Sequence, residues 1–324
     1  MDVIYTDNAL QDLGVLQGFS LDVDVAKECD FEIKVPSDHK GLQVKGYWYI
    51  DGMEYGGRID KIKVDTDADE LIYSGRNWRG ILASKVVCPP SGEAYRYLQG
   101  SWRPMLQDLL EELGLSELFM ADNAAAITMN NWKVDRYVTL LDMINKLLEE
   151  KDHRLNLWWS GADNKVRIGA VAIRDLTDEV QYETGDHVGL VVEDDQGGVN
   201  HLICIGQGEL EDREVIHLYC TRTGGITETA QYYTGLDDIQ AIYENTSAAT
   251  RDELKKGGID RLKELKNVQT FSAKVKDYDV QIGDIVGGVE RITGIRVAEP
   301  VTNIIFKINS AGEATTEYKV GENT

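Results

Sequence analysis

The chain has 324 residues, of which 42% are hydrophobic and 28% are charged, so it is ordinary for a globular protein and long enough for two domains. Asp and Glu number 56 against 34 Lys and Arg, which gives a net charge of −22. Because phosphate contacts need clustered Lys and Arg, this balance excludes tight nucleic-acid binding and attraction to an anionic membrane. The sequence shows no apolar run of about 18 residues and no signal peptide, so it predicts neither a membrane span nor export. Four scattered cysteines predict reduced thiols, as expected for a protein made in a cytoplasm.

The first 88 residues predict short β-strands joined by tight turns. Apolar and polar residues alternate over 44–50 and 61–64, which is the period of a strand. Asp51-Gly52 predicts a hairpin turn after the first of these strands. The segment 65–70 predicts a second turn, and 71–75 predicts the next strand.

Two amphipathic helices are predicted after Pro89-Pro90. The first follows Ser101, a candidate cap, and Gly114 is placed to end it. The second covers 138–150. Because adjacent amphipathic helices usually bury each other, we interpret both apolar stripes as core.

From Leu155 onward, strand patterns return and are interrupted once. Strands are predicted at LNLWW, VRIGAV and VGLVV, and then at 199–205 and 214–220. A long helical region at 236–267 follows, with Gly257-Gly258 as a weak point. Five short strands are expected to close the chain, at 268–275, 279–286, 289–297, 301–308 and 315–320.

These elements predict an α+β, β-rich fold with two β-domains. The first domain is expected to combine 1–88 with 151–196, and 89–150 to form a separable helical insertion. The second is expected to span 197–324 and to carry the helix at 236–267. Because both halves share a β–helix–β plan, the sequence indicates a structural duplication.

Two glycine-rich segments resemble phosphate-binding motifs only in part. Gly75 and Gly80 have the spacing of a phosphate loop, but Ile81-Leu82 stands where Lys and Ser or Thr are needed. Gly206-Gln207-Gly208 continues with an acid and lacks a third glycine, so it predicts a hairpin. We therefore expect no nucleotide cofactor.

Two clusters resemble metal sites. His201, Cys204, His217 and Cys220 have a zinc-like composition, but residues i and i+3 of a strand point to opposite faces, so we expect no shared metal. Asp65, Asp67 and Asp69 imitate the start of a calcium loop but lack its glycine and its final glutamate, so we interpret them as an acidic turn. The sequence also lacks G-x-S-x-G, H-E-x-x-H and CxxC motifs, and predicts neither a catalytic residue nor a cofactor.

Three stretches together resemble the hub proteins of phage tails, which include siphovirus tail-tip hubs, contractile baseplate hubs and the hubs of PBSX-like prophages. The first contains Gly75-Arg76-Asn77, Leu82 and Val86-Val87. The second contains Asn200-His201-Leu202-Ile203, Gly206-Gln207-Gly208-Glu209 and Arg213. The third contains Leu254, Gly258, Leu262, Phe271, Tyr278 and Gly283-Asp284-Ile285-Val286. The resemblance covers nearly the whole chain, and it departs from the family pattern at Trp78 and at the glycine pair 257–258.

The resemblance implies two tube-type β-barrel domains in each chain and a homotrimeric ring with pseudo-sixfold symmetry. Such a ring joins the hexameric tail tube to a trimeric tip or spike in the virion tail, and its implied partners are a tail-tube or distal tail protein, a tip or spike protein and a tape-measure protein. An acidic lumen lets DNA slide past, which suits the charge of −22. Candidate lumen-lining acids are Asp175, Asp178, Glu179, Glu183, Asp186, Glu193, Asp194 and Asp195. Candidate edges for ring closure are the hairpin at Asp51-Gly52 and the strands that flank Gly287-Gly288.

Two alternatives from other classes are a tail-tip cell-wall hydrolase and a carbohydrate-binding module. The hydrolase lacks a catalytic motif in this sequence. The binding module rests on the aromatic residues Trp48, Trp158 and Trp159. Because Trp158 and Trp159 are adjacent in a predicted strand, they face opposite sides, and at least one is expected in the core.

Overall fold

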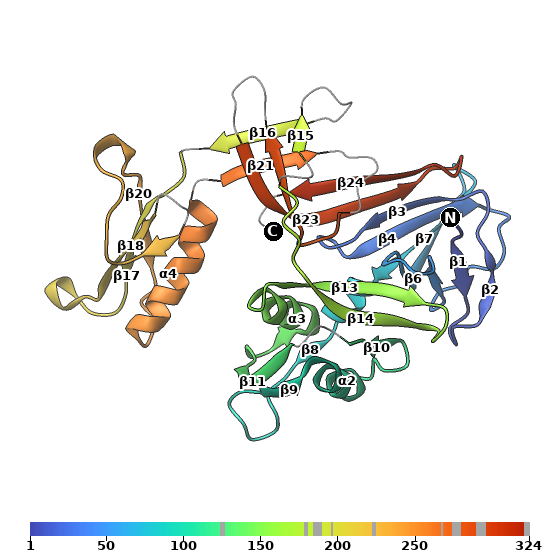
Figure 1. The fold of residues 1–324 in the computed structure, drawn as a ribbon, viewed down its shortest axis with the longest axis horizontal. Coiled ribbons are helices and arrows are strands. Elements are labelled where there is room, and N and C mark those ends of the chain that lie inside the picture. The colour runs from blue at the N-terminus through green and yellow to red at the C-terminus, as the bar shows by residue number, and fades with distance from the viewer. Residues whose placement is uncertain are drawn as a thin grey trace. The chain divides into compact units, whose positions relative to one another are not determined.

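The computed structural model describes residues 1–123, 127–177, 181–183, 190–195, 197–221, 225–266, 268–273, 280–289 and 296–320, and it confirms the α+β, β-rich class (Figure 1). The chain divides into two compact units, one of residues 1–190 with 272–322 and one of residues 191–271. This division differs from the expected domain boundaries, because the last strands of the chain pair with the first ones. In the part of the chain that the structure describes, no helix is long and apolar enough to cross a membrane.

A long antiparallel sheet forms the framework of the first unit. Its strands follow the order β24-β23-β3-β4-β7-β6-β5-β1-β2. Burial alternates along β4, where Phe31, Ile33 and Val35 are buried and the residues between them face outward. The bounds are β1 Ile4–Thr6, β2 Asp12–Val15, β3 Ser20–Asp24, β4 Asp30–Pro36, β5 Tyr47–Tyr49, β6 Gly56–Asp65, β7 Glu70–Asn77, β23 Arg296–Ile308 and β24 Ala314–Val320.

The predicted turns of this sheet are confirmed. Gly52 has φ +73° between β5 and β6, and Asp69 has φ +56° in the turn between β6 and β7. The strand expected at 44–50 is shorter, because Lys45 adopts φ +74° and ends the extended run before β5. Alternation alone does not reveal such a left-handed residue.

Helices α1 (Trp78–Ala83), α2 (Trp102–Glu112) and α3 (Leu140–Glu149) lie against a small sheet. The prediction of two helices here is confirmed, and Gly114 ends the first of them with φ +68°. The expected side-chain cap at Ser101 is wrong, because that side chain makes no cap hydrogen bond. Instead, the Trp102 N–H donates to the carbonyl of Ile127 at 3.0 Å.

One continuous core joins these helices to the small sheet β10-β14-β13. Trp159 of β13 is fully buried and stacks on Tyr49 at a centroid distance of 4.1 Å. Trp158 beside it is half-buried on the opposite face, as the strand period predicts. The expected helical insertion at 89–150 thus shares its core with strands from the segment after it. The bounds are β8 Val86–Val87, β9 Tyr97–Ser101, β10 Phe119–Ala121, β11 Thr128–Lys133, β12 Val138–Thr139, β13 His153–Ser160 and β14 Lys165–Ala172.

The second unit is built around a four-stranded sheet in the order β19-β18-β17-β20, with helix α4 (Arg251–Leu265) on one face. The helix expected at 236–267 is shorter than predicted. Residues 240–244 instead form β20, which pairs parallel with β17, and Thr250 caps the helix by accepting a hydrogen bond from the Glu253 N–H. The bounds are β16 Leu190–Asp195, β17 His201–Ile205, β18 Val215–Cys220, β19 Ile226–Thr227, β20 Gln240–Glu244, β21 Val268–Ala273 and the short 3₁₀-helices at 210–212 and 235–237.

The glycine pair in α4 has a packing reason. Gly258 is buried against the sheet, and a methyl group there would lie 2.9 Å from Cδ1 of Leu218 and closer still to Sγ of Cys204. Gly257 faces the hydroxyl of Tyr243 instead. Gly258 therefore lets the helix backbone approach the sheet closely.

Among the described residues, the closing strands differ from the prediction in their bounds. The strand expected at 301–308 is the second part of the longer strand β23, and most of the strand expected at 289–297 lies outside the described residues. The strand expected at 279–286 begins later, as β22 (Ile285–Val289), because Gly283 turns the chain with φ +92°. Pairing of β23 with β22, β24 and β3 supports its full length.

Candidate functional site

An acidic face covers the outer side of β3 and β4, and it consists of Asp22, Asp24, Asp30 and Glu32. Asp22 lies directly opposite Glu32 in the antiparallel register, and Asp24 lies opposite Asp30. These acids alternate with the buried residues of the same strands, so the pleat directs all four to one side. The sequence carries this signal as a period-two row of acids, but the predicted lumen-lining residues did not include it.

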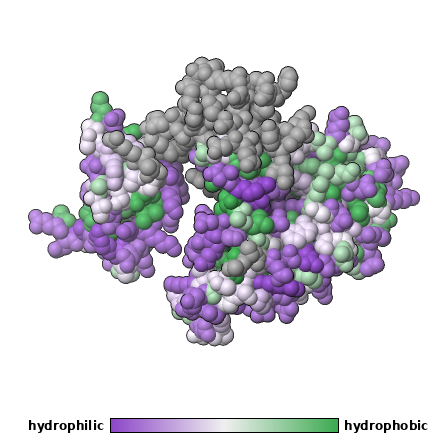
Figure 2. Space-filling view, viewed as in Figure 1, coloured by the Kyte–Doolittle hydropathy of each residue, from purple (hydrophilic) through white to green (hydrophobic). Residues whose placement is uncertain are grey.

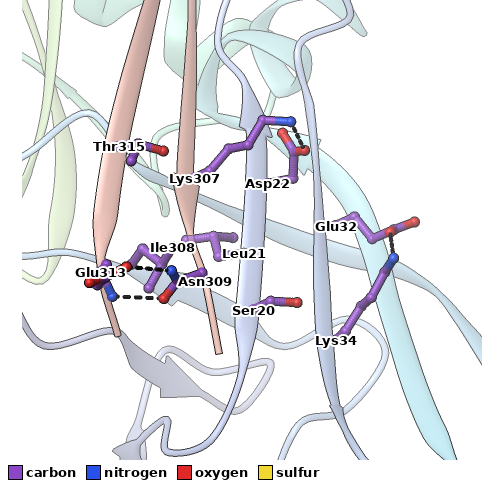
Figure 3. Close-up of a pocket in the computed structure, with 10 residues that line it drawn as sticks. All are labelled: Ser20, Leu21, Asp22, Glu32, Lys34, Lys307, Ile308, Asn309, Glu313 and Thr315. Atoms are coloured by element: carbon purple, nitrogen blue, oxygen red, sulfur yellow. Dashed lines mark hydrogen bonds and ion pairs between the residues drawn. The ribbon is translucent and has the colours of Figure 1, made fainter. Parts of the chain in front are cut away.

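Every lysine of this surface that lines the hollow in Figure 3 is paired with a carboxylate. Lys307 Nζ lies 2.5 Å from Oδ2 of Asp22, and Lys34 Nζ lies 3.1 Å from Oε1 of Glu32. The hollow has a volume of about 280 Å³ and is lined by β3, β4, β23 and β24. Because both cations are neutralised, the surface offers no concentrated positive charge to a phosphate.

The environment of Asp30 and Asp24 shows how crowded this negative charge is. Partial burial, and then the charges of Asp24, Glu28, Asp22 and Glu32, raise the pKa of Asp30 above its ordinary value. Asp24 accepts hydrogen bonds from the N–H groups of Lys27 and Glu28, at 2.9 and 3.0 Å. The face is therefore an anionic surface held in place by the sheet and the following turn.

Three of the eight acids that the sequence predicted to line a lumen lie outside the residues that the structure describes. Asp175 is exposed, and its carboxylate accepts hydrogen bonds from the N–H and the hydroxyl of Thr177, which lower its pKa. Glu183 lies in β15 (Gln181–Glu183), and Glu193, Asp194 and Asp195 lie in β16. Asp178, Glu179 and Asp186 lie outside the described residues. Their role in a lumen stays a prediction.

The two histidines of the zinc-like cluster lie together and the two cysteines lie elsewhere. Nε2 of His201 is 2.8 Å from Nδ1 of His217, and Nδ1 of His201 is 3.1 Å from Oδ1 of Asp238. Cys204 and Cys220 belong to the core on the α4 side of the sheet, which confirms the predicted strand geometry. Burial raises the pKa of the Cys204 thiol to about 11, so it stays protonated at neutral pH.

The phosphate-like and calcium-like segments have structural roles. Asn77 ends β7 and caps α1, with its side chain accepting from the Gly80 N–H at 2.8 Å. Arg79 is buried against Glu54 and therefore does not face solvent. Gly206 to Gly208 lie between β17 and β18, and Asp65 accepts from the Ala68 N–H in the turn before β7.

Three polar residues of the resembling stretches are buried and tie distant segments together. Asn77 donates to the carbonyls of Asp24 and Val25, at 2.8 and 3.0 Å. Asn200 donates to the carbonyl of Asp237 and accepts from the Ile239 N–H. Asp284 is fully buried and accepts from Arg154, Arg174 and the Gln281 N–H. These three residues therefore stabilise the fold by joining segments that are far apart in the sequence.

Solved structures of phage tail proteins share this fold over nearly its whole length. A tail protein from Neisseria meningitidis MC58 is 14% identical, with a TM-score of 0.55, and the match covers 99% of this chain and 96% of that one. The 43 kDa tail protein of prophage MuSo2 from Shewanella oneidensis is 12% identical, with a TM-score of 0.60 and coverages of 99% and 98%. A chain of the phage P2 baseplate is 9% identical, with a TM-score of 0.50 and coverages of 99% and 98%. No protein-family model and no curated protein matches the sequence. The chain thus has the fold of phage tail proteins, in agreement with the resemblance in its sequence.

Proposed function

We propose that the protein is a structural hub of a phage or phage-like tail, which forms a ring around the DNA channel and joins the tail tube to the tip or spike. The observation that carries this proposal is the shared fold, which extends over 99% of this chain and 98% of a prophage tail protein. Three copies with two tube-like β-domains each would present six similar positions to a hexameric tube. The neighbours in this arrangement are a tail-tube or distal tail protein, a tip or spike protein and a tape-measure protein.

The acidic face of β3 and β4 supports a role at the channel. A surface that passes DNA must repel phosphate rather than retain it, and here the lysines lining the hollow are already paired with Asp22 and Glu32. We assign this face to the lumen. The eight acids predicted from the sequence remain candidates for the same lining. Asp22→Lys with Glu32→Lys would then create a phosphate-binding surface in the channel.

The ring is tested by the mass of the purified chain in solution and by electron microscopy of negatively stained particles. We expect a mass of three chains by light scattering and a ring with a central hole wide enough for duplex DNA. A chain that stays monomeric at every concentration, and that forms no ring when mixed with its tail-tube protein, would refute the proposal. The second test is DNA retention, for which the Asp22→Lys and Glu32→Lys ring should bind duplex DNA more tightly than the unchanged ring.

The two alternatives have less support from the described residues. Trp48 and Trp159 are fully buried, so neither is available to stack on a sugar. The buried thiols have raised pKa values, which makes them poor nucleophiles. Clearing of bacterial cell walls in a zymogram by the purified chain would favour the hydrolase, and glycan binding above background would favour the binding module.

A further inference from the structure

A groove in the first unit has no part in the proposed hub function. It has a volume of about 780 Å³ and is lined by residues of β13, β14, β23, β24 and the turn at 52–55, all of them in the first unit. Ligand pockets usually have volumes of roughly 300–1,000 Å³, so this groove is large enough for a ligand. Four aromatic side chains line it, whereas hydrophilic residues predominate on the face drawn in Figure 2.

A row of side chains on the outer face of β13 forms one wall of the groove. Arg154, Asn156 and Trp158 alternate with buried residues, so the pleat directs them to one side. The ring of Trp158 lies against the buried Gly169 of β14, where a methyl group would be only 3.1 Å from Cζ3 of the ring. One face of the indole thus covers the sheet, and the other face is available to a ligand in the groove.

An aromatic pair forms a second wall. Tyr55 stacks on Phe306 with a centroid distance of 4.0 Å and an angle of 9° between the ring planes. Phe306 and Tyr318 are buried residues of β23 and β24, so the long sheet holds this wall in place. The groove therefore has two apolar surfaces that are fixed by regular structure, as is typical of a preformed binding site.

Each charged side chain that lines the groove is already bonded within the chain. Arg154 and Arg174 both bond to Asp284, at 2.7 and 2.5 Å. Glu54 bonds to the buried Arg79 at 2.5 Å. Because an ionic ligand would have to displace these ion pairs, the groove favours an uncharged ligand.

The hydrogen-bonding groups left to a ligand are a carboxamide and an indole N–H. In the described part of the chain, neither the Asn156 side chain nor the Trp158 N–H has a hydrogen-bond partner, and neither is buried. Both groups therefore reach the surface of the groove. A carboxamide has two donor hydrogens and an acceptor oxygen, so it bonds well to two neighbouring hydroxyl groups.

A peptide strand fits this wall poorly, because the backbone edge beside it is taken. The Gly52 N–H donates to the carbonyl of Trp159, and the Trp159 N–H donates to the carbonyl of Met53, both at 3.0 Å. The hairpin at Asp51-Gly52, which the sequence suggested as an edge for ring closure, is thus bonded to β13. The other suggested edge is also taken, since β22 lies between β15 and β23. At this end of β13, the groove offers side chains rather than free backbone.

We propose that this groove binds an uncharged oligosaccharide, with one sugar ring stacked on Trp158. A pyranose ring has C–H groups on its faces and hydroxyl groups at its rim, so it matches an aromatic surface beside a carboxamide. Asn156 lies two residues from Trp158 on the same face and bonds to the hydroxyl groups beside the stacked ring. The site goes beyond the proposed hub function and does not rest on it.

The experiment measures the binding of cellohexaose, maltohexaose and the hexamer of N-acetylglucosamine to the whole chain by calorimetry. We expect at least one of them to bind with a Kd below about 1 mM. Trp158→Ala removes the stacking surface and should raise that Kd roughly tenfold or more. Asn156→Ala should also raise it, and because the carboxamide has no partner in the described chain, this variant should keep the thermal midpoint of the unchanged chain. Trp132→Ala is the matched control, since Trp132 is also half-buried but lies on β11 outside the groove, and it should leave the Kd unchanged.

The possible outcomes are distinct. If none of the three sugars binds, or if both groove variants bind as the unchanged chain does, the proposal is wrong. Binding of a short uncharged peptide in place of the sugars, weakened by the same two variants, would make this a peptide site and would also contradict it. The mass in solution tests the hub separately: a chain that binds sugar but never assembles overturns the hub and leaves this site standing, and a trimer that binds no sugar does the reverse.

Discussion

Gly258 in α4 is predicted to be a packing residue, and Gly258→Ala tests that directly. In an exposed helix, this change stabilises by about 1 kcal/mol, because alanine has the higher helix propensity. Here the added methyl group would meet Sγ of Cys204 and Cδ1 of Leu218, both on fully buried side chains. Overpacking of this kind costs about 1–3 kcal/mol, and it outweighs the propensity. We expect a net loss of up to about 2 kcal/mol.

The neighbouring Gly257 provides a matched control. An alanine there meets the outer end of the half-exposed Tyr243 ring, with the hydroxyl at 2.5 Å and Cζ at 3.2 Å, and that side chain can move aside. Gly257→Ala should therefore be neutral or stabilising by up to about 1 kcal/mol. The measurement is hydrogen exchange of peptides from α4 and β17 in the whole chain, because two compact units need not unfold as one.

The expected exchange rates separate the two explanations. A loss approaching about 2 kcal/mol speeds local exchange by up to about 30-fold in the Gly258 variant. Combining it with Cys204→Ala removes the sulfur atom, so the double variant should lose less stability than the two single changes predict together. If Gly258→Ala slows exchange as Gly257→Ala does, the close helix–sheet contact described here is wrong.

Three further predictions concern buried polar groups and thiols. Asp284→Asn should destabilise the first unit by about 3–5 kcal/mol in thermal unfolding, because it leaves the two arginines beside it without their carboxylate. Burial alone would raise the pKa of Asp284, but hydrogen bonds from Arg174 and Gln281 and the charge of Arg154 outweigh it and lower the pKa, so its contribution is present above pH 4 and is lost as pH falls further. Asn200→Ala should speed exchange at the start of β20, since it removes the hydrogen bonds to the Asp237 carbonyl and from the Ile239 N–H, worth about 0.5–1.5 kcal/mol each. A maleimide should label one thiol per native chain rapidly, at Cys88, because the other three are buried.

Local patterns predicted much of the secondary structure. The strands around 44–75, the two helices after Pro89-Pro90 and the hairpin turns follow from periodicity and turn residues, and all of them are present, although the first of these strands is shorter than predicted. The start of α4 was predicted too early, because the five residues of β20 alternate too briefly to outweigh their helical surroundings. Parallel pairing with β17 stabilises β20, and that contact is not visible in a local window.

Long-range pairing explains what the sequence could not predict. Strand β23 lies beside β3, although nearly the whole chain separates them, and this contact moves the last strands into the first unit. The acidic face was visible as alternating acids in β3 and β4, but its significance depends on the register that places Asp22 beside Glu32 and Lys307 beside Asp22. The stretch 175–195 contains more acids than β3 and β4 together. The sequence therefore favoured that stretch as the candidate lining of a lumen.

The resembling stretches and the fold comparison support each other for a physical reason. Asn77, Asn200 and Asp284 are buried, and each satisfies its polar atoms by hydrogen bonds to backbone or charged groups. Apolar core positions accept many side chains of similar volume, whereas these three need one particular arrangement of donors and acceptors. Such residues therefore constrain the sequence of this fold more tightly than its apolar core positions do. At Asn77 the same residue also caps α1, so it fixes where a strand ends and a helix begins.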